Sequence, residues 1–262
     1  MSEKNKIALI TGASSGIGRD LAIEFAKKNY DLIVVARSID KLEELKKKIA
    51  KEYNVNVQTY MADVSDENAC KILHKFVKEK YKNIDVLVNN AGFGLCGQFV
   101  DTDLDTEVSM IKTNVIGLHI LTKLFLQDMV KRDSGYILNV ASIASFMPGP
   151  LMATYYSTKA YVLRLTQSIR VELKKMNSNV KISALCPGPV NTNFNNVANV
   201  KFAISGQSSE YVAKNTVSKM EKGKTLIFPS LGVCLYRGLV RILPDNFAGS
   251  INYKMQKRKI ER

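Results

Sequence analysis

A tyrosine and a lysine four positions apart are the residues of this chain whose types and spacing most directly suggest chemistry. Tyr155 and Lys159 belong to a segment with apolar residues at helical spacing, so their side chains are expected on one face of a helix. A phenol ionises near pH ~10, and a positive charge beside it favours the phenolate. We therefore expect Lys159 to lower the pKa of Tyr155 and the pair to act as an acid/base device.

The same register excludes the neighbouring tyrosine, because Tyr156 lies four residues before Ala160 rather than before a lysine. Taken alone, the pair could equally be two surface residues, since a tyrosine and a lysine at this spacing occur on many helices. A strand expected over residues 135–140 supports the chemical interpretation. It delivers Ser142 to the carboxyl end of a sheet, where open α/β folds bind their ligands.

A glycine-rich loop near the N-terminus predicts a phosphate-binding site. An apolar strand expected over residues 6–11 runs into Thr11-Gly12-Ala13-Ser14-Ser15-Gly16-Ile17-Gly18, and an amphipathic helix follows directly. Glycines allow the backbone to approach a ligand closely, and the free N–H groups at the start of a helix attract phosphate. The spacing differs from the commoner Gly-x-Gly-x-x-Gly fingerprint and could mark a tight turn alone, but the flanking strand and helix predict a dinucleotide-binding βαβ unit.

The end of the second expected strand, residues 31–36, indicates which dinucleotide would bind. In such a unit an acidic residue at this place accepts from the ribose 2′-hydroxyl of NAD, whereas an arginine accommodates the 2′-phosphate of NADP. Arg37 follows the strand, with no carboxylate beside it. NADP(H) is therefore favoured, with Ser14 or Ser15 as further donors to the phosphate. The alternative is that Arg37 is a surface residue and that NAD(H) is used.

The remaining pattern predicts an α/β fold: a single-domain, Rossmann-like, doubly wound parallel sheet of about seven strands over residues 1–262, with helices on both faces. Asn114 lies within an apolar stretch of a long helix expected over residues 104–131, and a polar amide there needs a partner. The other strands are expected over residues 55–62, 84–88, 180–186 and 225–228, and the other helices over residues 39–53, 67–81, 154–176 and 209–221, with Ser65 or Asp66 capping the second of these.

Composition narrows the class of protein further. The formal net charge is +14, but the lysines are spread along the chain without a nucleic-acid-binding motif, so a solvated surface is the simpler interpretation. No apolar run is long enough to span a membrane. The four cysteines are far apart and only two histidines are present, so we expect no metal site and a cytoplasmic protein with reduced, mostly buried thiols.

Six motifs occur together in a characteristic order: Thr11-Gly12-x-x-x-Gly16-x-Gly18, Asn89-Asn90-Ala91-Gly92, Asn114, Ser142, Tyr155-x-x-x-Lys159 and Pro187-Gly188. Over about residues 6 to 228 the chain closely resembles the classical short-chain dehydrogenase/reductase (SDR) family, of the NADP(H)-preferring type. The resemblance implies a catalytic set of Asn114, Ser142, Tyr155 and Lys159.

In that set Tyr155 is the general acid in carbonyl reduction and Ser142 holds the substrate oxygen. Lys159 binds the nicotinamide ribose and lowers the pKa of Tyr155, while Asn114 supports a water-linked proton path to Lys159. Asp63 would bind adenine, although from its position alone it could equally be a turn residue. The expected cofactor contacts are Gly12, Ser14, Ser15, Gly16, Ile17, Gly18, Arg37, Asp63, Val64, Asn90, Ala91, Gly92, Pro187, Gly188, Val190 and Thr192, together with Tyr155 and Lys159.

The implied function is an NADP(H)-dependent oxidoreductase that interconverts a carbonyl and a secondary alcohol. Residues 191–222 are expected to form a substrate lid and a helix. The segments 144–152 and 93–95 are mainly apolar and are expected to line the substrate pocket, which favours a hydrophobic, steroid-like or acyl ketone or alcohol. The alternatives are a dehydrogenase of a small polar alcohol, such as a sugar or hydroxy amino acid, and a non-catalytic NADP(H)-binding sensor.

The segment 229–262 is not explained by the family pattern. We expect a C-terminal extension of two amphipathic helices separated by Pro244. It could pack on the core or extend a dimer contact, cap an apolar substrate pocket, or make a weak peripheral membrane contact through its apolar face and Lys257-Arg258-Lys259. A homodimer through the helices that carry Asn114 and Tyr155 is expected, with a tetramer as the alternative.

Overall fold

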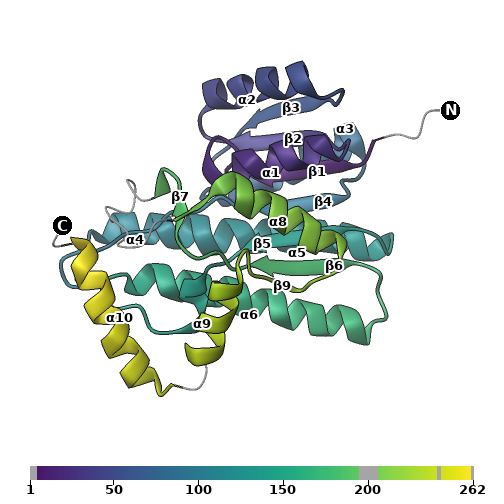
Figure 1. The fold of residues 1–262 in the computed structure, drawn as a ribbon. Coiled ribbons are helices and arrows are strands. Elements are labelled where there is room, and N and C mark those ends of the chain that lie inside the picture. Colours follow the sequence, from purple (N-terminus) through teal and green to yellow (C-terminus); the bar gives the residue numbers. More distant parts are fainter. Residues whose placement is uncertain (1–4, 195–205, 241–242, 261–262) are drawn as a thin grey trace.

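The computed structural model describes residues 5–194, 206–240 and 243–260, and its centre is a parallel sheet of seven strands (Figure 1). The strand order is β3-β2-β1-β4-β5-β6-β9, and every neighbouring pair is parallel. The strands are β1 (Ile7–Thr11), β2 (Asp31–Ala36), β3 (Val57–Met61), β4 (Val86–Asn89), β5 (Tyr136–Val140), β6 (Lys181–Leu185) and β9 (Leu226–Ile227). The predicted Rossmann-like fold is confirmed.

The central strand β1 shows why the apolar runs form a doubly covered sheet. All five of its residues are buried. Ala8 and Ile10 face one hydrophobic cluster, whereas Ile7 and Leu9 face the other. Successive side chains of a strand point to opposite faces, so a strand covered on both sides reads as a continuous apolar run.

Helices cover the two faces in separate layers. The first layer consists of α1 (Gly16–Lys27), α2 (Ile39–Glu52) and α8 (Ser209–Glu221), and the second consists of α3 (Glu67–Tyr81), α5 (Leu118–Lys131) and α6 (Ala153–Lys175). Because all seven strands run the same way, the loops that follow their carboxyl ends meet along one edge of the sheet. That edge receives Ser142, which follows β5 and begins the short 3₁₀ helix η2 (Ile143–Phe146).

The helix expected over residues 104–131 is interrupted by a wider turn. It consists of α4 (Leu104–Ile111), a π-helical segment η1 (Lys112–Gly117) and α5. Asn114 lies in the π-helical segment, and single π turns inside α-helices are frequent at functional sites. A small parallel pair, β7 (Val190–Asn191) with β8 (Gln207–Ser208), also lies outside the pattern that the sequence predicted. Of the expected lid, residues 195–205 lie outside the described part of the chain.

The C-terminal extension forms two helices on either side of Pro244, as expected: α9 (Leu231–Val240) and α10 (Asp245–Ile260). The expectation that both are amphipathic is wrong for α10. Its exposed side chains include Phe247 and Ile251, whereas Asn252 and Gln256 are buried. The larger apolar side chains therefore face outward, and the inward face carries these two amides together with Ala248 and Gly249.

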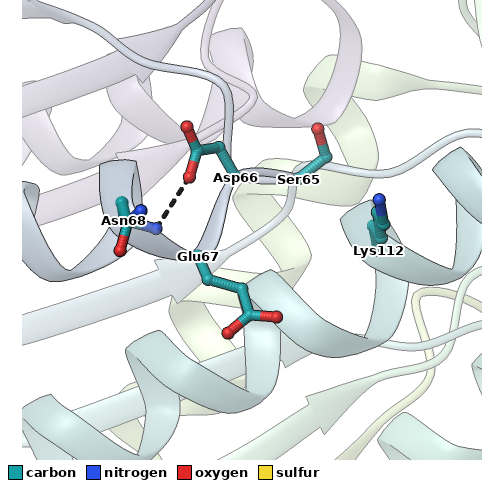
Figure 2. Close-up of a pocket in the computed structure, with 5 residues that line it drawn as sticks. All are labelled: Ser65, Asp66, Glu67, Asn68 and Lys112. Carbon is teal, nitrogen blue, oxygen red and sulfur yellow. Dashed lines mark hydrogen bonds between the residues drawn. The ribbon is translucent and has the colours of Figure 1, made fainter.

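A shallow hollow at the start of α3 shows how that helix begins (Figure 2). Its lining residues are Ser65, Asp66, Glu67, Asn68 and Lys112. The Asp66 carboxylate accepts from the backbone N–H of Asn68 at 2.7 Å and from that of Ala69 at 3.3 Å. Asp66 is thus the N-cap, which decides between the two residues that the sequence offered.

Replacing Asp66 by alanine should therefore destabilise the protein. We expect Asp66→Ala to lower the free energy of unfolding by about 1 kcal/mol, because two N–H groups lose their acceptor, and Asp66→Ser to restore most of it. Urea titration measures both. Glu67→Ala, which removes a neighbouring carboxylate without removing the cap, is the control. Equal losses for the two alanine variants would contradict the capping role.

Candidate active site

The catalytic residues that the sequence predicts lie at the carboxyl edge of the sheet around one cavity of about 1030 Å³. Ser142, Tyr155 and Lys159 line this cavity. So do all the predicted cofactor residues except Gly18. Asn114 does not line it. A volume of this size suits a large ligand.

Ser142 and Tyr155 lie next to each other. The Ser142 hydroxyl is close enough to the Tyr155 phenol to act on its pKa in the lowering direction, and it accepts from the backbone N–H of Ala144 at 3.1 Å. Ser145, which the sequence reading did not single out, holds both elements in place. Its hydroxyl accepts from the Ser142 N–H at 3.3 Å and donates to the Lys159 carbonyl at 2.8 Å, which ties η2 to α6.

Lys159 is buried, with 5% of its surface exposed. Its ammonium donates to the Val140 carbonyl at 2.8 Å and lies 6.0 Å from the centre of the Tyr155 ring. Burial lowers the pKa of Lys159 to about 8, because removal from water penalises the charged form.

The expected lowering of the Tyr155 pKa by Lys159 is not found in this structure. Burial instead raises the pKa of Tyr155 to about 12, and only the hydrogen bond from Ser142 acts to lower it. The helical register does place the two residues on one face, but the ammonium is bonded to Val140 rather than to the phenol. At neutral pH the Tyr155 hydroxyl therefore keeps its proton, which suits a proton donor.

Asn114 has the partners that its apolar surroundings require. Its amide N–H groups donate to the Phe93 carbonyl at 2.9 Å and to the Thr158 hydroxyl at 3.1 Å, and its oxygen accepts from the Phe93 N–H at 3.1 Å. A side chain at Gly92 would lie 2.8 Å from the Asn114 oxygen and 3.4 Å from the Lys159 nitrogen, so the two groups meet over this glycine. The wider π turn directs Asn114 toward the loop after β4.

The conformation of the glycine loop depends on close backbone contacts and on hydrogen bonds from Asn90. Gly12 adopts a φ of 65°, which favours glycine. A Cβ at Gly18 would approach the Gly12 carbonyl oxygen to 2.3 Å. Gly18 thus allows α1 to pack against the loop, although it does not line the cavity. The Asn90 side chain donates to the carbonyls of Thr11 and Gly12 at 3.0 and 3.1 Å, which fixes the loop to the end of β4.

Two cationic side chains, those of Arg37 and Lys41, line the cavity just after β2. Arg37 lines the cavity, and its guanidinium lies 3.8 Å from the Asp63 carboxylate. Asp63 also accepts from the backbone and hydroxyl of Ser65 at 2.9 and 2.7 Å, so it serves as a turn residue as well as a cavity residue. Lys41, on the first turn of α2, lines the same region. Sequence reasoning missed it, although its spacing from Arg37 across a helix start was a usable signal.

The cavity wall also contains a buried acceptor for which the described residues offer no donor. The side-chain oxygen of Gln207 is buried and has no hydrogen-bond partner among the described residues. Gln207 pairs with Val190 and lies beside the Pro187-Gly188 turn, so it belongs to the wall expected to hold the nicotinamide. An unpaired buried acceptor is costly, and a ligand donor would satisfy it. The glycine cradle, the two cations and this acceptor fit a phosphorylated dinucleotide.

The remaining wall is mainly apolar and includes the C-terminal extension. Met152 packs with Tyr155, Tyr156 and Phe194. Asn252, Met255 and Gln256 of α10 line the cavity beside them. The extension therefore packs on the core through Val233 of α9, and α10 forms part of the cavity wall, as expected for a cap over the pocket.

Comparison with known proteins identifies the family. A family model for short-chain dehydrogenases matches residues 6–201. The NADP-dependent 3-hydroxy acid dehydrogenase of Schizosaccharomyces pombe is 36% identical over 216 residues, which cover 80% of each chain. The chain belongs to the short-chain dehydrogenase/reductase family, and it is an oxidoreductase of that family.

Solved structures agree with this assignment. A short-chain dehydrogenase from Sphingobium yanoikuyae, in complex with NADPH, has a TM-score of 0.82 and 27% identity, covering 91% of this chain and 96% of that one. An alcohol dehydrogenase from the archaeon Thermococcus sibiricus, complexed with 5-hydroxy-NADP, has a TM-score of 0.76 and 28% identity over 86% of this chain and 96% of that one.

Within the part of the chain that the structure describes, no helix combines the length and apolar character needed to cross a bilayer. The same residues contain no group of three or more histidine, cysteine or acidic side chains that could hold a metal ion.

Burial of the Lys159 ammonium predicts how the free energy of unfolding depends on pH. The pKa of Lys159 is about 8 in the folded protein against 10.5 as the ordinary value, so between these limits the unfolded chain binds more protons and stability rises with pH. Lys159→Met removes this dependence. We expect the unfolding free energy of the variant, relative to the wild type, to fall by roughly 3 kcal/mol between pH 8 and 10.5.

Urea denaturation of the ligand-free protein at a series of pH values measures this difference. Lys123→Met, which removes an exposed lysine on α5, controls for the loss of one surface charge. A Lys159→Met difference that stays flat with pH would show that the ammonium is not penalised by burial.

Proposed function

We propose that this protein is an NADP(H)-dependent oxidoreductase that interconverts a carbonyl and a secondary alcohol, with Tyr155 as the general acid/base. The observation that carries this proposal is that Ser142 and Tyr155 lie next to each other at the wall of a cavity that the glycine loop also lines. Two hydroxyl groups held together can bind the same substrate oxygen. One of them can then protonate it.

The residues of this chain divide the chemistry between them. When bound, NADPH supplies a hydride to the carbonyl carbon. Ser142 donates to the carbonyl oxygen and stabilises the negative charge that develops there. Tyr155, whose pKa burial raises to about 12, carries the proton at neutral pH and delivers it to that oxygen. In this role Lys159 binds the nicotinamide ribose and stabilises the phenolate that remains, and Asn114 supports proton return toward Lys159.

The cofactor preference rests on the cations at the end of β2. Arg37 and Lys41 both line the cavity. Among the described residues, Arg37 has one long ion pair, at 3.8 Å to Asp63, and none is found for Lys41. A ribose 2′-phosphate placed there would bind both cations. The S. pombe relative is NADP-dependent, and two similar structures hold NADPH or an NADP derivative. We propose NADP(H) as the preferred cofactor and NAD(H) as the weaker one.

The substrate is proposed to be an uncharged hydrophobic ketone or alcohol, such as a steroid-like or acyl compound. The wall beside Tyr155 contains Phe93, Met147, Met152 and Phe194, which offer apolar contacts and adaptable shape. A small polar substrate would leave these contacts unused. The homodimer and the cytoplasmic location stay predictions.

Loss of the Tyr155 hydroxyl should separate catalysis from binding. We expect Tyr155→Phe to lower kcat roughly 10²- to 10⁴-fold, because proton transfer is lost, while the Kd for NADPH changes little. NADPH oxidation with a panel of steroid, acyl and polar ketones gives kcat, and fluorescence titration gives Kd. Tyr161→Phe is the matched control, since this exposed hydroxyl on the same helix bonds His119 instead. Normal turnover by Tyr155→Phe would refute the assignment, and NADPH binding without turnover of any ketone by the wild type would favour a sensor.

Removal of the cations at the end of β2 should affect NADPH and NADH differently. Arg37→Ala and Lys41→Ala are each expected to raise the Kd of NADPH roughly tenfold or more, because a charge-assisted bond to phosphate is lost, and to leave the Kd of NADH nearly unchanged. Lys47→Ala, which removes an exposed lysine on the same helix, is the control. Equal weakening of both cofactors would contradict a role in phosphate recognition.

A further inference from the structure

The inward face of α10 buries two amide side chains, where an ordinary surface helix buries large apolar ones. Phe247 and Ile251 are 56% and 41% exposed, whereas Asn252 and Gln256 are 3% and 1% exposed. A helix added only for packing would bury its apolar groups and expose its amides, because buried amides must be hydrogen-bonded to avoid a large penalty. The inverted arrangement indicates that the inward amides have a use of their own.

Those amides meet the tyrosine that follows Tyr155. The Gln256 side-chain N–H donates to the Tyr156 hydroxyl at 2.6 Å and to the Asn252 oxygen at 3.3 Å. Asn252 donates to the Pro148 carbonyl at 2.8 Å, which anchors α10 to the loop before α6. The three side chains form one cluster, named here the amide cluster: Tyr156, Asn252 and Gln256.

The amide cluster belongs to the wall of the cavity that contains the proposed catalytic residues. All three side chains line that cavity together with Ser142 and Tyr155. The rings of Tyr155 and Tyr156 are 6.2 Å apart, with an angle of 76° between their planes. One ligand can therefore contact Tyr155 through its reacting carbonyl and reach the amide cluster with another part of the same molecule.

Two members of the amide cluster, Tyr156 and Asn252, can donate to a ligand, judged from their hydrogen bonds to the described residues. The Tyr156 hydroxyl donates to the Asn252 oxygen at 3.5 Å, which is the outer limit of a hydrogen bond. This proton can turn to a better acceptor. Asn252 has two side-chain N–H groups, and among the described residues the only acceptor for them is the Pro148 carbonyl. The ligand group that fits is an acceptor oxygen.

Charge decides which acceptor oxygen is suitable. The charged residues that line the cavity within the described part of the chain are Arg37, Lys41, Asp63 and Lys159. The first three lie at the ends of β2 and β3, and Lys159 lies at the catalytic centre. None of these four belongs to the amide cluster, so a carboxylate placed there would meet no cation among the described residues that line the cavity.

We infer that the amide cluster is a neutral hydrogen-bonding subsite for a second oxygen of the substrate, remote from the reacting carbonyl. The ligand class is an uncharged, mainly apolar ketone that also carries an ether, hydroxyl or second carbonyl oxygen. This inference rests on the proposed function for the identity of the reacting group, but the subsite can bind a ligand whether or not turnover follows.

Matched ligands test the subsite. The probes are para-methoxyacetophenone, which has a distal acceptor, para-ethylacetophenone, which is similar in shape without one, and the charged para-carboxyacetophenone. The Kd of each is measured by competition NMR in the presence of NADP⁺, and kcat/KM is measured where turnover occurs. In the wild type we expect the methoxy ketone to bind roughly three- to tenfold more tightly than the ethyl ketone, and the carboxylate to bind most weakly.

The variants Asn252→Leu and Gln256→Met should abolish the preference for the methoxy ketone and leave the Kd of the ethyl ketone within about twofold, since the apolar contacts remain. Asn246→Leu, at an exposed position on the same helix, is the matched control and should keep the preference. Thermal unfolding and the Kd of NADPH show whether each variant is folded. A purely structural amide cluster predicts that both neutral ketones weaken by the same factor.

Three results would overturn the inference: equal weakening of the two neutral ketones in the variants, no preference for the methoxy ketone in the wild type, or tightest binding of the carboxylate. Failure of the proposed function looks different. In that case no probe is reduced, while the Kd values still show whether Asn252 and Gln256 distinguish the two neutral ketones.

Discussion

A lysine buried beside a tyrosine is the constraint on which the site depends. The Lys159 ammonium is almost fully enclosed, and burial of a charge is unfavourable unless polar groups meet it. The Val140 carbonyl at the end of β5 supplies one such group. Ser145 ties the backbone of Lys159 to η2. The same contacts fix the start of α6 against the sheet edge, and thereby hold Tyr155 next to Ser142.

Much of this arrangement could be predicted because it depends on local pattern. The apolar runs predicted the strands, since a strand covered on both faces needs nonpolar residues at every position. The glycine spacing, the Tyr-x-x-x-Lys register and Ser142 after the fifth strand predicted which residues converge at the carboxyl edge. Asn89, from one of the motifs named in the sequence, ties β4 to β5 by donating a hydrogen bond from its side-chain amide to the Asn139 side-chain oxygen at 2.9 Å. These features follow from helix and strand geometry alone.

Other features could not be predicted, because they depend on contacts between distant segments. Asn114, in the π turn, hydrogen-bonds Phe93 and Thr158, which lie 21 and 44 residues away in the sequence. The direction of the Tyr155 pKa shift was predicted wrongly. Helical spacing brings the side chains of Tyr155 and Lys159 to one face, but it does not determine which acceptor the Lys159 ammonium binds. Register correctly separated Tyr156 from Lys159, yet it gave no sign that Tyr156 meets a helix about 100 residues later.

The C-terminal helix shows why hydrophobic pattern alone is an incomplete guide. Its apolar residues suggested a face that packs, and burial of Phe247 or Ile251 would have stabilised such a helix at little cost. The chain instead buries Asn252 and Gln256, whose amides must be paired with Tyr156 and Pro148 to be tolerated. A packed apolar face would seal the cavity without distinguishing between ligands of the same shape. In the subsite inferred above, polar groups at the same wall favour a ligand with a matching oxygen over an analogue of the same shape that lacks one, because Tyr156 and Asn252 can donate to that oxygen.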